Sequence, residues 1–223
     1  MRLQLVTANP DDAAPATIPP AFGELGRATL HELFADDGRD AAAAGFALAG
    51  LAPDRPLLWV QDRMALREAG RVFPRGMKRC ELIHVEAPDA KAALWAMEEG
   101  LRCPALGAVV GEIWGEPRAL DFTATRRLAV AAERTGVPAR LILFSAEPNL
   151  SGARARWRVR SRPSPPHPWD DEAPGAPAWG LELFKARGFA PGRWEVAHEA
   201  DGFRLLSPLG AGKLDAADGR SAA

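Results

Sequence analysis

Hydrophobic positions along the chain form short apolar runs that alternate with longer segments of helical period up to about residue 145. The runs are typical of strands buried on both faces. The expected strands are 29–34, 55–61, 81–88, 105–114 and 139–145. The expected helices between them are 40–51, 64–79, 89–102 and 120–136. Strands and helices that alternate at this spacing predict βαβ crossovers, and therefore an α/β fold with a mostly parallel sheet between two helical layers.

The pattern changes after residue 145, where strand-like segments follow one another with turns between them. They indicate a C-terminal antiparallel extension over 153–206, after a parallel core that ends at about 145. Its expected strands are 153–161, 178–187, 193–199 and 202–207. A Pro-rich loop is expected at 162–177. We place one domain at 22–206, between a flexible leader (1–21) and a disordered tail (207–223).

Composition narrows the function classes. The 223 residues are 47% hydrophobic and include 28 basic and 29 acidic side chains, for a net charge of −1. Bulk attraction to nucleic acid or anionic lipid is therefore not indicated. Cys80 and Cys103 make no CxxC motif, which favours a reducing, cytoplasmic compartment. The sequence contains no run of roughly 18 apolar residues, so no membrane span is expected.

Five segments together resemble a known family. They read LHELFA, RPLLWVQDR, ALGAVVGEIWG, ARARWRV and LELFKARGFAPGRWEV. Their order is similar to that of RecA-type ATPase cores, and the last segment is the most distinctive. Over residues 22–206 the chain is identified as similar to the ImuA family of RecA-like and SulA-like accessory proteins. The resemblance implies a RecA-like three-layer core.

The same resemblance implies a role in SOS-induced translesion DNA synthesis and mutagenesis. The partners that it implies are an ImuB-type polymerase-like protein, RecA and an error-prone replicative-type polymerase. Direct contact with DNA is left open, and no membrane partner is expected. An alternative is a SulA-like inhibitor of cell division that binds FtsZ, and another is an atypical ATPase or DNA-binding protein.

The loop after the first strand stands where a RecA-type protein carries its phosphate loop. Such a loop needs glycine N–H groups, a lysine and a Ser or Thr hydroxyl. Ala41 and Ala42 stand where the lysine and the hydroxyl are expected. The loop itself consists of Asp36, Asp37, Gly38, Arg39 and Asp40. Three carboxylates repel a polyphosphate, and we expect a degenerate nucleotide site with no ATPase activity and no cofactor.

The other nucleotide-site positions agree with this expectation. Gln61, Asp62 and Arg63 stand at the end of the second strand, where a catalytic glutamate is expected; Asp62 is a candidate substitute, but the register favours Arg63 at that position. Glu112 matches the Walker B acid in position, but we expect it to serve structure or partner contact. The GAGK motif at 210–213 follows no strand and belongs to the tail.

Arginine alternates through ARARWRVRSR, at Arg154, Arg156, Arg158, Arg160 and Arg162. In a strand all five lie on one face, with Trp157 and Val159 on the other. Three interpretations stay open for this face: a solvated or salt-bridged surface, a site for an acidic protein partner, or a nucleic-acid site.

Residues 178–206 combine aromatic and basic side chains that are typical of interface hot spots. The candidates for partner or DNA contact there are Trp179, Phe184, Lys185, Arg187 and Trp194. His84 and Glu86 form an HxE pair as in zinc deaminases, but no PCxxC follows, and a strand histidine is the expected role. No metal site or catalytic residue is predicted.

Overall fold

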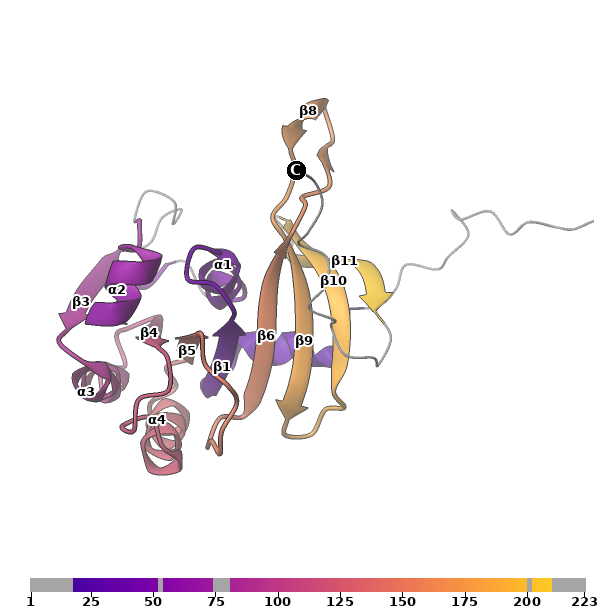
Figure 1. The fold of residues 1–223 in the computed structure, drawn as a ribbon. Helices are drawn as coiled ribbons and strands as arrows, with labels where there is room; N and C mark the ends of the chain where they lie inside the picture. The colour runs from indigo at the N-terminus through magenta and orange to yellow at the C-terminus, as the bar shows by residue number, and fades with distance from the viewer. Residues whose placement is uncertain (1–17, 52–53, 74–80, 200–201, 210–223) are drawn as a thin grey trace, which may run out of the picture.

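A nine-stranded sheet forms the centre of the molecule in the computed structural model, which describes residues 18–51, 54–73, 81–199 and 202–209 (Figure 1). Its strands are β1 (Leu30–Ala35), β2 (Leu57–Asp62), β3 (Leu82–Ala87), β4 (Ala108–Trp114), β5 (Ala139–Phe144), β6 (Ala155–Arg162), β9 (Ala178–Ala186), β10 (Gly192–Glu199) and β11 (Gly202–Leu209). Their order across the sheet is β11-β10-β9-β6-β1-β5-β4-β2-β3. The strands up to β6 run parallel to their neighbours, and β9 to β11 are antiparallel.

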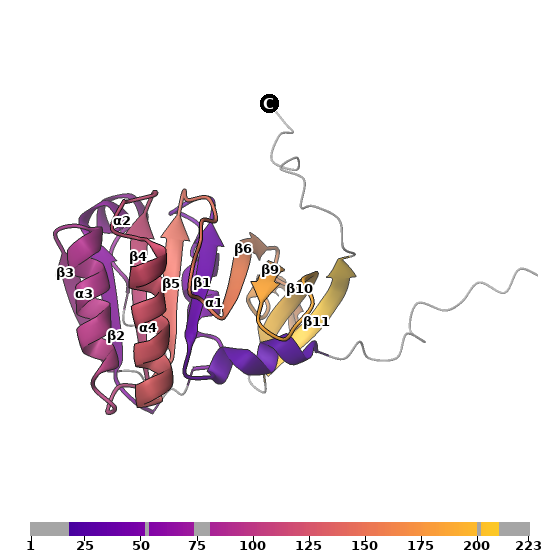
Figure 2. The same cartoon turned by 90° about the horizontal axis from the view of Figure 1, so that it is seen from below.

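The α/β class and the RecA-like three-layer arrangement are thereby confirmed. The helical elements are η2 (Pro20–Gly26), α1 (Ala42–Leu48), α2 (Arg63–Ala69), α3 (Ala90–Leu101) and α4 (Phe122–Thr135). Helices α3 and α4 lie side by side over one face of the parallel strands, and α1 and α2 lie on the other (Figures 1 and 2). Within the described part of the chain, no helix is long and apolar enough to cross a membrane.

Aspartate caps set the beginnings of three helices. The side chains of Asp62, Asp89 and Asp121 each accept a hydrogen bond from the backbone N–H three residues later. This bond satisfies one of the N–H groups that the first helical turn leaves unpaired. Gly136 ends α4 in the left-handed conformation, with φ of 78°, as its sequence position predicts.

The sequence pattern predicts strand β6 in the antiparallel extension, but this strand pairs in parallel with one neighbour and antiparallel with the other. It runs parallel to β1, with Leu33 opposite Trp157, and antiparallel to β9. The extension therefore begins at β9, and β6 joins it to the parallel core. A strand's polarity depends on partners far away in sequence, so the local pattern did not reveal it.

Two boundaries and one loop also differ from the predictions. The Pro-rich segment 162–177 contains a small hairpin, β7 (Pro166–His167) and β8 (Asp170–Pro174), which projects from the main sheet (Figure 1). Structure begins before residue 22, in η2, and β11 continues to Leu209. The leader up to residue 17 and the tail from 210, including GAGK, lie outside the described residues.

Aromatic side chains fill the core between the sheet and the layer of η2 and α1. Trp157 is fully buried at its centre. Its ring contacts Phe22 of η2 and Phe46 of α1 edge to face, at centroid distances of 5.6 and 5.5 Å. One side chain of β6 thus attaches both covering elements to the sheet.

Replacing Trp157 by Ala should lower the free energy of unfolding by about 3–5 kcal/mol, because it leaves a large cavity between three elements. Urea unfolding followed by circular dichroism measures this change. Trp169, which is 91% exposed in the β7–β8 hairpin, offers the matched control. Trp169→Ala should change stability by no more than about 0.5 kcal/mol. Equal losses in the two variants would contradict the proposed position of Trp157.

Candidate functional site

The loop between β1 and α1 lies where a phosphate loop is expected. Carboxylates of the loop itself accept hydrogen bonds from backbone N–H groups there. Asp40 Oδ1 accepts a hydrogen bond of 2.9 Å from the N–H of Ala42, the first residue of α1. Asp37 Oδ1 accepts one of 2.9 Å from the N–H of Arg39. That backbone bond lowers the pKa of Asp37. N–H groups that would face a phosphate are thus already paired with carboxylates.

An aromatic side chain packs against the tip of this loop. A Cβ atom at Gly38 would lie 2.6 Å from Cζ3 of Trp114, which ends β4. The Trp114 ring packs in turn on Phe144 of β5, at a centroid distance of 5.9 Å. Glycine is therefore required at position 38 because the indole approaches the loop backbone, and this requirement involves no phosphate.

The acidic loop is bound to β6, and this contact brings together two features that the sequence presented separately. Asp36 forms an ion pair of 2.7 Å with Arg160. Asp40 Oδ2 accepts a hydrogen bond of 3.0 Å from the N–H of Ser161. The acidic loop thereby contacts the arginine-rich strand, which also pairs directly with β1.

Glu112, at the Walker B position, is buried and paired with side chains of β2. Trp59 Nε1 donates to its Oε1 at 2.9 Å, and Gln61 Nε2 donates to its Oε2 at 2.7 Å. Gln61 Oε1 accepts a bond of 2.8 Å from Nε2 of His84, whose Nδ1 lies 3.0 Å from the Arg71 guanidinium. A chain of hydrogen bonds therefore runs from the surface to the core carboxyl group.

Burial raises the pKa of Glu112 to about 7, and the nearby Asp62 adds to the rise. The two donated hydrogen bonds favour the charged form but do not offset the loss of hydration. Asp62 itself is committed to structure, because its two oxygens accept the N–H groups of Ala65 and Trp114, at 2.6 and 3.2 Å. Arg63, at the position of the catalytic glutamate, begins α2 and is exposed.

The arginines of β6 lie on one face of the strand, and Trp157 and Val159 lie in the core on the other. Arg156 is buried and forms an ion pair of 2.6 Å with Glu32 of β1. Its guanidinium also donates to the carbonyl of Asn149 and lies over the Phe34 ring. Arg156 is therefore a core residue, and a role in partner contact does not fit its position.

Of the remaining arginines of this face, Arg158, Arg160 and Arg162 are partly exposed and paired with acidic side chains of the chain itself. Arg158 lies 3.5 Å from Glu182, and Arg162 lies 2.8 Å from Glu195. Arg154 precedes β6, and its N–H donates to the carbonyl of Leu30. Salt bridges thus account for most of the arginine face.

The predicted contact residues of the C-terminal segment separate into core and surface groups. Trp179 is buried, and Trp194 is partly buried against the same core. Phe184 packs on Phe34 and beneath the guanidinium of Arg158. Lys185 and Arg187 are exposed at the end of β9. A contact role for these two basic residues stays a prediction.

Metal-binding and thiol chemistry find little support in the described residues. No group of three or more His, Cys, Asp or Glu side chains that could hold a metal ion occurs among them. His84 pairs with Gln61 and Arg71, and burial lowers its pKa. Cys103 is exposed with a free thiol, and Cys80 lies outside the described part of the chain.

Two curated relatives share substantial sequence with this chain. Both are named Protein ImuA and come from Caulobacter vibrioides, one from strain NA1000 / CB15N and one from strain ATCC 19089 / CIP 103742 / CB 15. Each is 33% identical over 168 residues, which cover 69% of this chain. The chain belongs to the ImuA family. It spans 66% of the length of each relative, and no family model matches it.

The acidic partners of the arginines were missed at the sequence level in this ImuA-family chain. Glu32 lies on β1 and Glu182 on β9, the two neighbours of β6 in the sheet. Glu195 lies on β10, the next strand beyond β9. The strand alternation of GLELF and RWEV carried a signal, since it places Glu182 and Glu195 opposite the core face. Which strands lie together could not be read from that alternation.

Because its pKa is raised from 4.5 to about 7, Glu112 should make stability depend on pH. Between these values the folded chain keeps a proton that the unfolded chain has lost, so its contribution falls as pH rises. Between about pH 5 and pH 8 the free energy of unfolding should fall by about 2–3 kcal/mol from this group.

Chemical unfolding of Glu112→Gln at both pH values measures this contribution, because glutamine does not titrate. The variant should lack the fall, whatever its absolute stability. Glu133→Gln, which alters an exposed residue of α4, should keep it. The same pH slope in Glu112→Gln and wild type would show that Glu112 is ionised in the folded chain at both pH values.

Proposed function

We propose that the chain is a non-catalytic, RecA-like accessory protein in damage-induced mutagenesis and translesion DNA synthesis. Its task would be to recruit or bridge an ImuB-type polymerase-like protein, RecA and an error-prone polymerase. Membership of the ImuA family is the observation that carries this proposal. Localisation in the cytoplasm, where these partners act, belongs to the proposal.

The state of the nucleotide loop supports the non-catalytic part. A bound nucleotide would have to displace Asp40 from the N–H of Ala42 and face the carboxylate of Asp36. It would also meet the Trp114 ring at Gly38. With alanines at the lysine and hydroxyl positions, Arg39 is the one cation of the loop, and it already pairs with Asp37.

Isothermal titration of the purified chain with ATP and Mg²⁺ should give no binding heat at millimolar nucleotide. The loop carboxylates would repel the phosphates of ATP, and the Trp114 ring packs against the loop at Gly38. A RecA-type ATPase titrated in the same buffer provides the positive control. Saturable heat that Asp40→Ala alters would instead favour an atypical ATPase and refute the non-catalytic proposal.

Exposed basic residues at the end of β9 support recruitment through this part of the sheet. Lys185 and Arg187 are both exposed and follow directly on the salt-bridged arginine face. Exposed cations at the rim of an interface act mainly on the rate of encounter and on its salt dependence. An acidic protein surface, or the phosphates of DNA, would be attracted here.

Co-purification with an ImuB-type protein encoded in the same genome tests recruitment. The complex should form at micromolar concentration, and Lys185→Glu with Arg187→Glu should weaken it about tenfold or more through charge repulsion. Arg63→Glu with Arg118→Glu, two exposed positions elsewhere, provides the charge-matched control.

Deletion of the gene should abolish damage-induced mutations, measured as resistance frequencies after ultraviolet exposure. Absence of any complex together with unchanged mutagenesis would overturn the proposal. Filamentation on overproduction in that case would favour the division-inhibitor alternative.

A further inference from the structure

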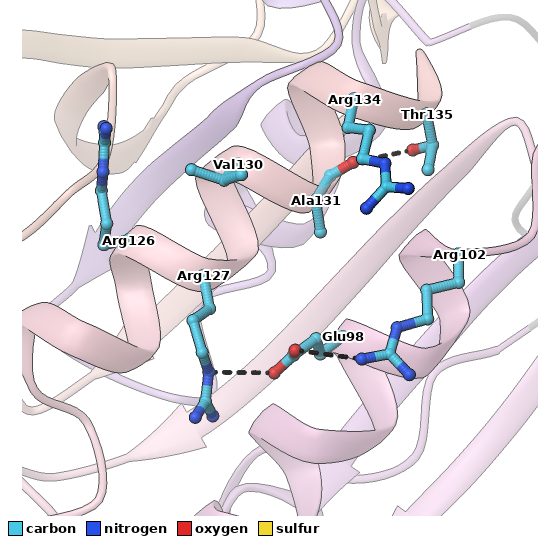
Figure 3. A pocket seen from close by; sticks show the side chains of 8 residues that line it. All are labelled: Glu98, Arg102, Arg126, Arg127, Val130, Ala131, Arg134 and Thr135. Atoms are coloured by element: carbon cyan, nitrogen blue, oxygen red, sulfur yellow. Dashed lines mark hydrogen bonds and ion pairs between the residues drawn. The ribbon is translucent and has the colours of Figure 1, made fainter.

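A groove of about 530 Å³ runs between α3 and α4 on the outer surface of the helical layer (Figure 3). It lies along α4 from Arg126 to Thr135 and beside the end of α3. The charged side chains that line it are Glu98, Arg102, Arg126, Arg127 and Arg134. Four arginines against one glutamate make this groove strongly positive, although the chain as a whole has a net charge of −1.

The single glutamate of the groove is already paired. Glu98 lies 3.1 Å from Arg127 and 3.4 Å from Arg102 (Figure 3). The Arg102 guanidinium also forms an ion pair of 2.8 Å with Glu99. Among the described residues, Arg126 and Arg134 show no hydrogen bond or ion pair to any side chain. Both are exposed on α4. The groove therefore offers two guanidiniums without a counter-charge.

Exposed apolar side chains lie on the same two helices as the groove. Val130, which lines the groove, is 44% exposed, and Phe122 on the same helix is also 44% exposed. Trp95 of α3 is 63% exposed and lies two turns before Arg102 on the same side of the helix. Such a cluster of large apolar residues near one groove is a common mark of a protein-binding surface.

A fourth apolar residue reaches the same region through the loop that connects β5 to β6. This loop packs on α4, since a Cβ at Gly152 would lie 2.7 Å from the Cα of Arg126. Asn149 donates a hydrogen bond to the carbonyl of Leu120, just before α4. The loop thus holds Leu150, which is 70% exposed, beside the N-terminal half of the helix.

We propose that the α3–α4 groove is a docking site for an acidic segment of a protein partner that also carries apolar side chains. Its carboxylates would pair with Arg126 and Arg134, and its apolar residues would cover Val130 and the exposed aromatic rings. Arginine and aromatic side chains together are the residues that contribute most to protein interfaces. The proposal deepens the recruiting function above, and it adds a surface on the face of the sheet that carries α3 and α4.

Nucleic acid fits the groove less well. Phosphate contacts use cations and polar donors, and interfaces with DNA are more polar than those between proteins. Here Val130 lines the groove with the arginines, and Phe122 and Trp95 on the same two helices and Leu150 in the adjoining loop expose further apolar surface, which a phosphate backbone would leave in water.

Fluorescence anisotropy with a short labelled peptide tests the site, using the full chain. The probe alternates Glu or Asp with Leu or Phe, and a second peptide replaces its acidic residues by Lys. We expect the acidic peptide to bind and the basic one not to bind. Arg126→Glu with Arg134→Glu should weaken binding at least about tenfold.

Two further variants separate the site from general charge and folding effects. Arg63→Glu with Arg118→Glu makes the same change in net charge at exposed positions outside the groove, and it should leave affinity within about twofold. Arg126→Gln with Arg134→Gln avoids placing an acid at the carboxyl end of α4, and it should give an intermediate loss.

Equal affinity of the groove variant and its charge-matched control would overturn the proposal. A single-stranded oligonucleotide that displaces the peptide, and whose own binding is lost in the groove variant, would replace it with a nucleic-acid site. In both cases an ImuB-type complex that still forms with the groove variant would leave the recruiting function standing, so the two failures are distinguishable.

Discussion

The buried ion pair between Glu32 and Arg156 joins the two halves of the sheet. Glu32 lies on β1, which pairs in parallel with both of its neighbours. Arg156 lies on β6, which pairs in parallel with β1 and antiparallel with β9. Removing two charges from water costs several kcal/mol, which is offset only when the remaining donors and acceptors are paired. Here Ser151 donates to Glu32, and Nη1 of Arg156 donates to the carbonyl of Asn149, whereas Nη2 of Arg156 has no hydrogen-bond partner among the described residues and the guanidinium lies over the Phe34 ring. The pair therefore also fixes the loop that leads into β6.

With β6 fixed in this way, its side chains alternate between the aromatic core on one face of the sheet and the ion pairs on the other. Trp157 enters the aromatic core under η2 and α1, and Arg158 and Arg162 face acidic side chains of β9 and β10. The acidic loop after β1 adds Asp36 and Asp40 as further contacts to the same strand. The loop thus adds an ion pair and a hydrogen bond to the direct pairing of β1 with β6.

Local pattern predicted most of the fold because its helices and parallel strands differ in period and are marked by Asp caps and Gly136. Long-range pairing escaped prediction, as the parallel contact between β1 and β6 shows. The same limit applies to the site. Alternation placed Arg156 among exposed cations, although Glu32, far away in sequence, draws it into the core. The groove escaped entirely, since it depends on the packing of α3 against α4.

Glu112 shows how burial acts on a carboxyl group whose hydrogen-bond partners are neutral. A carboxylate at this depth needs a positive charge to remain ionised, and its neighbours are the neutral donors Trp59 and Gln61. Burial therefore raises its pKa, and at neutral pH the protonated and charged forms are close in free energy. A core carboxyl group of this kind contributes little attraction to any ligand. Arg126 and Arg134, by contrast, are exposed at the α3–α4 groove and form no ion pair among the described residues, and the binding of an acidic partner is proposed there.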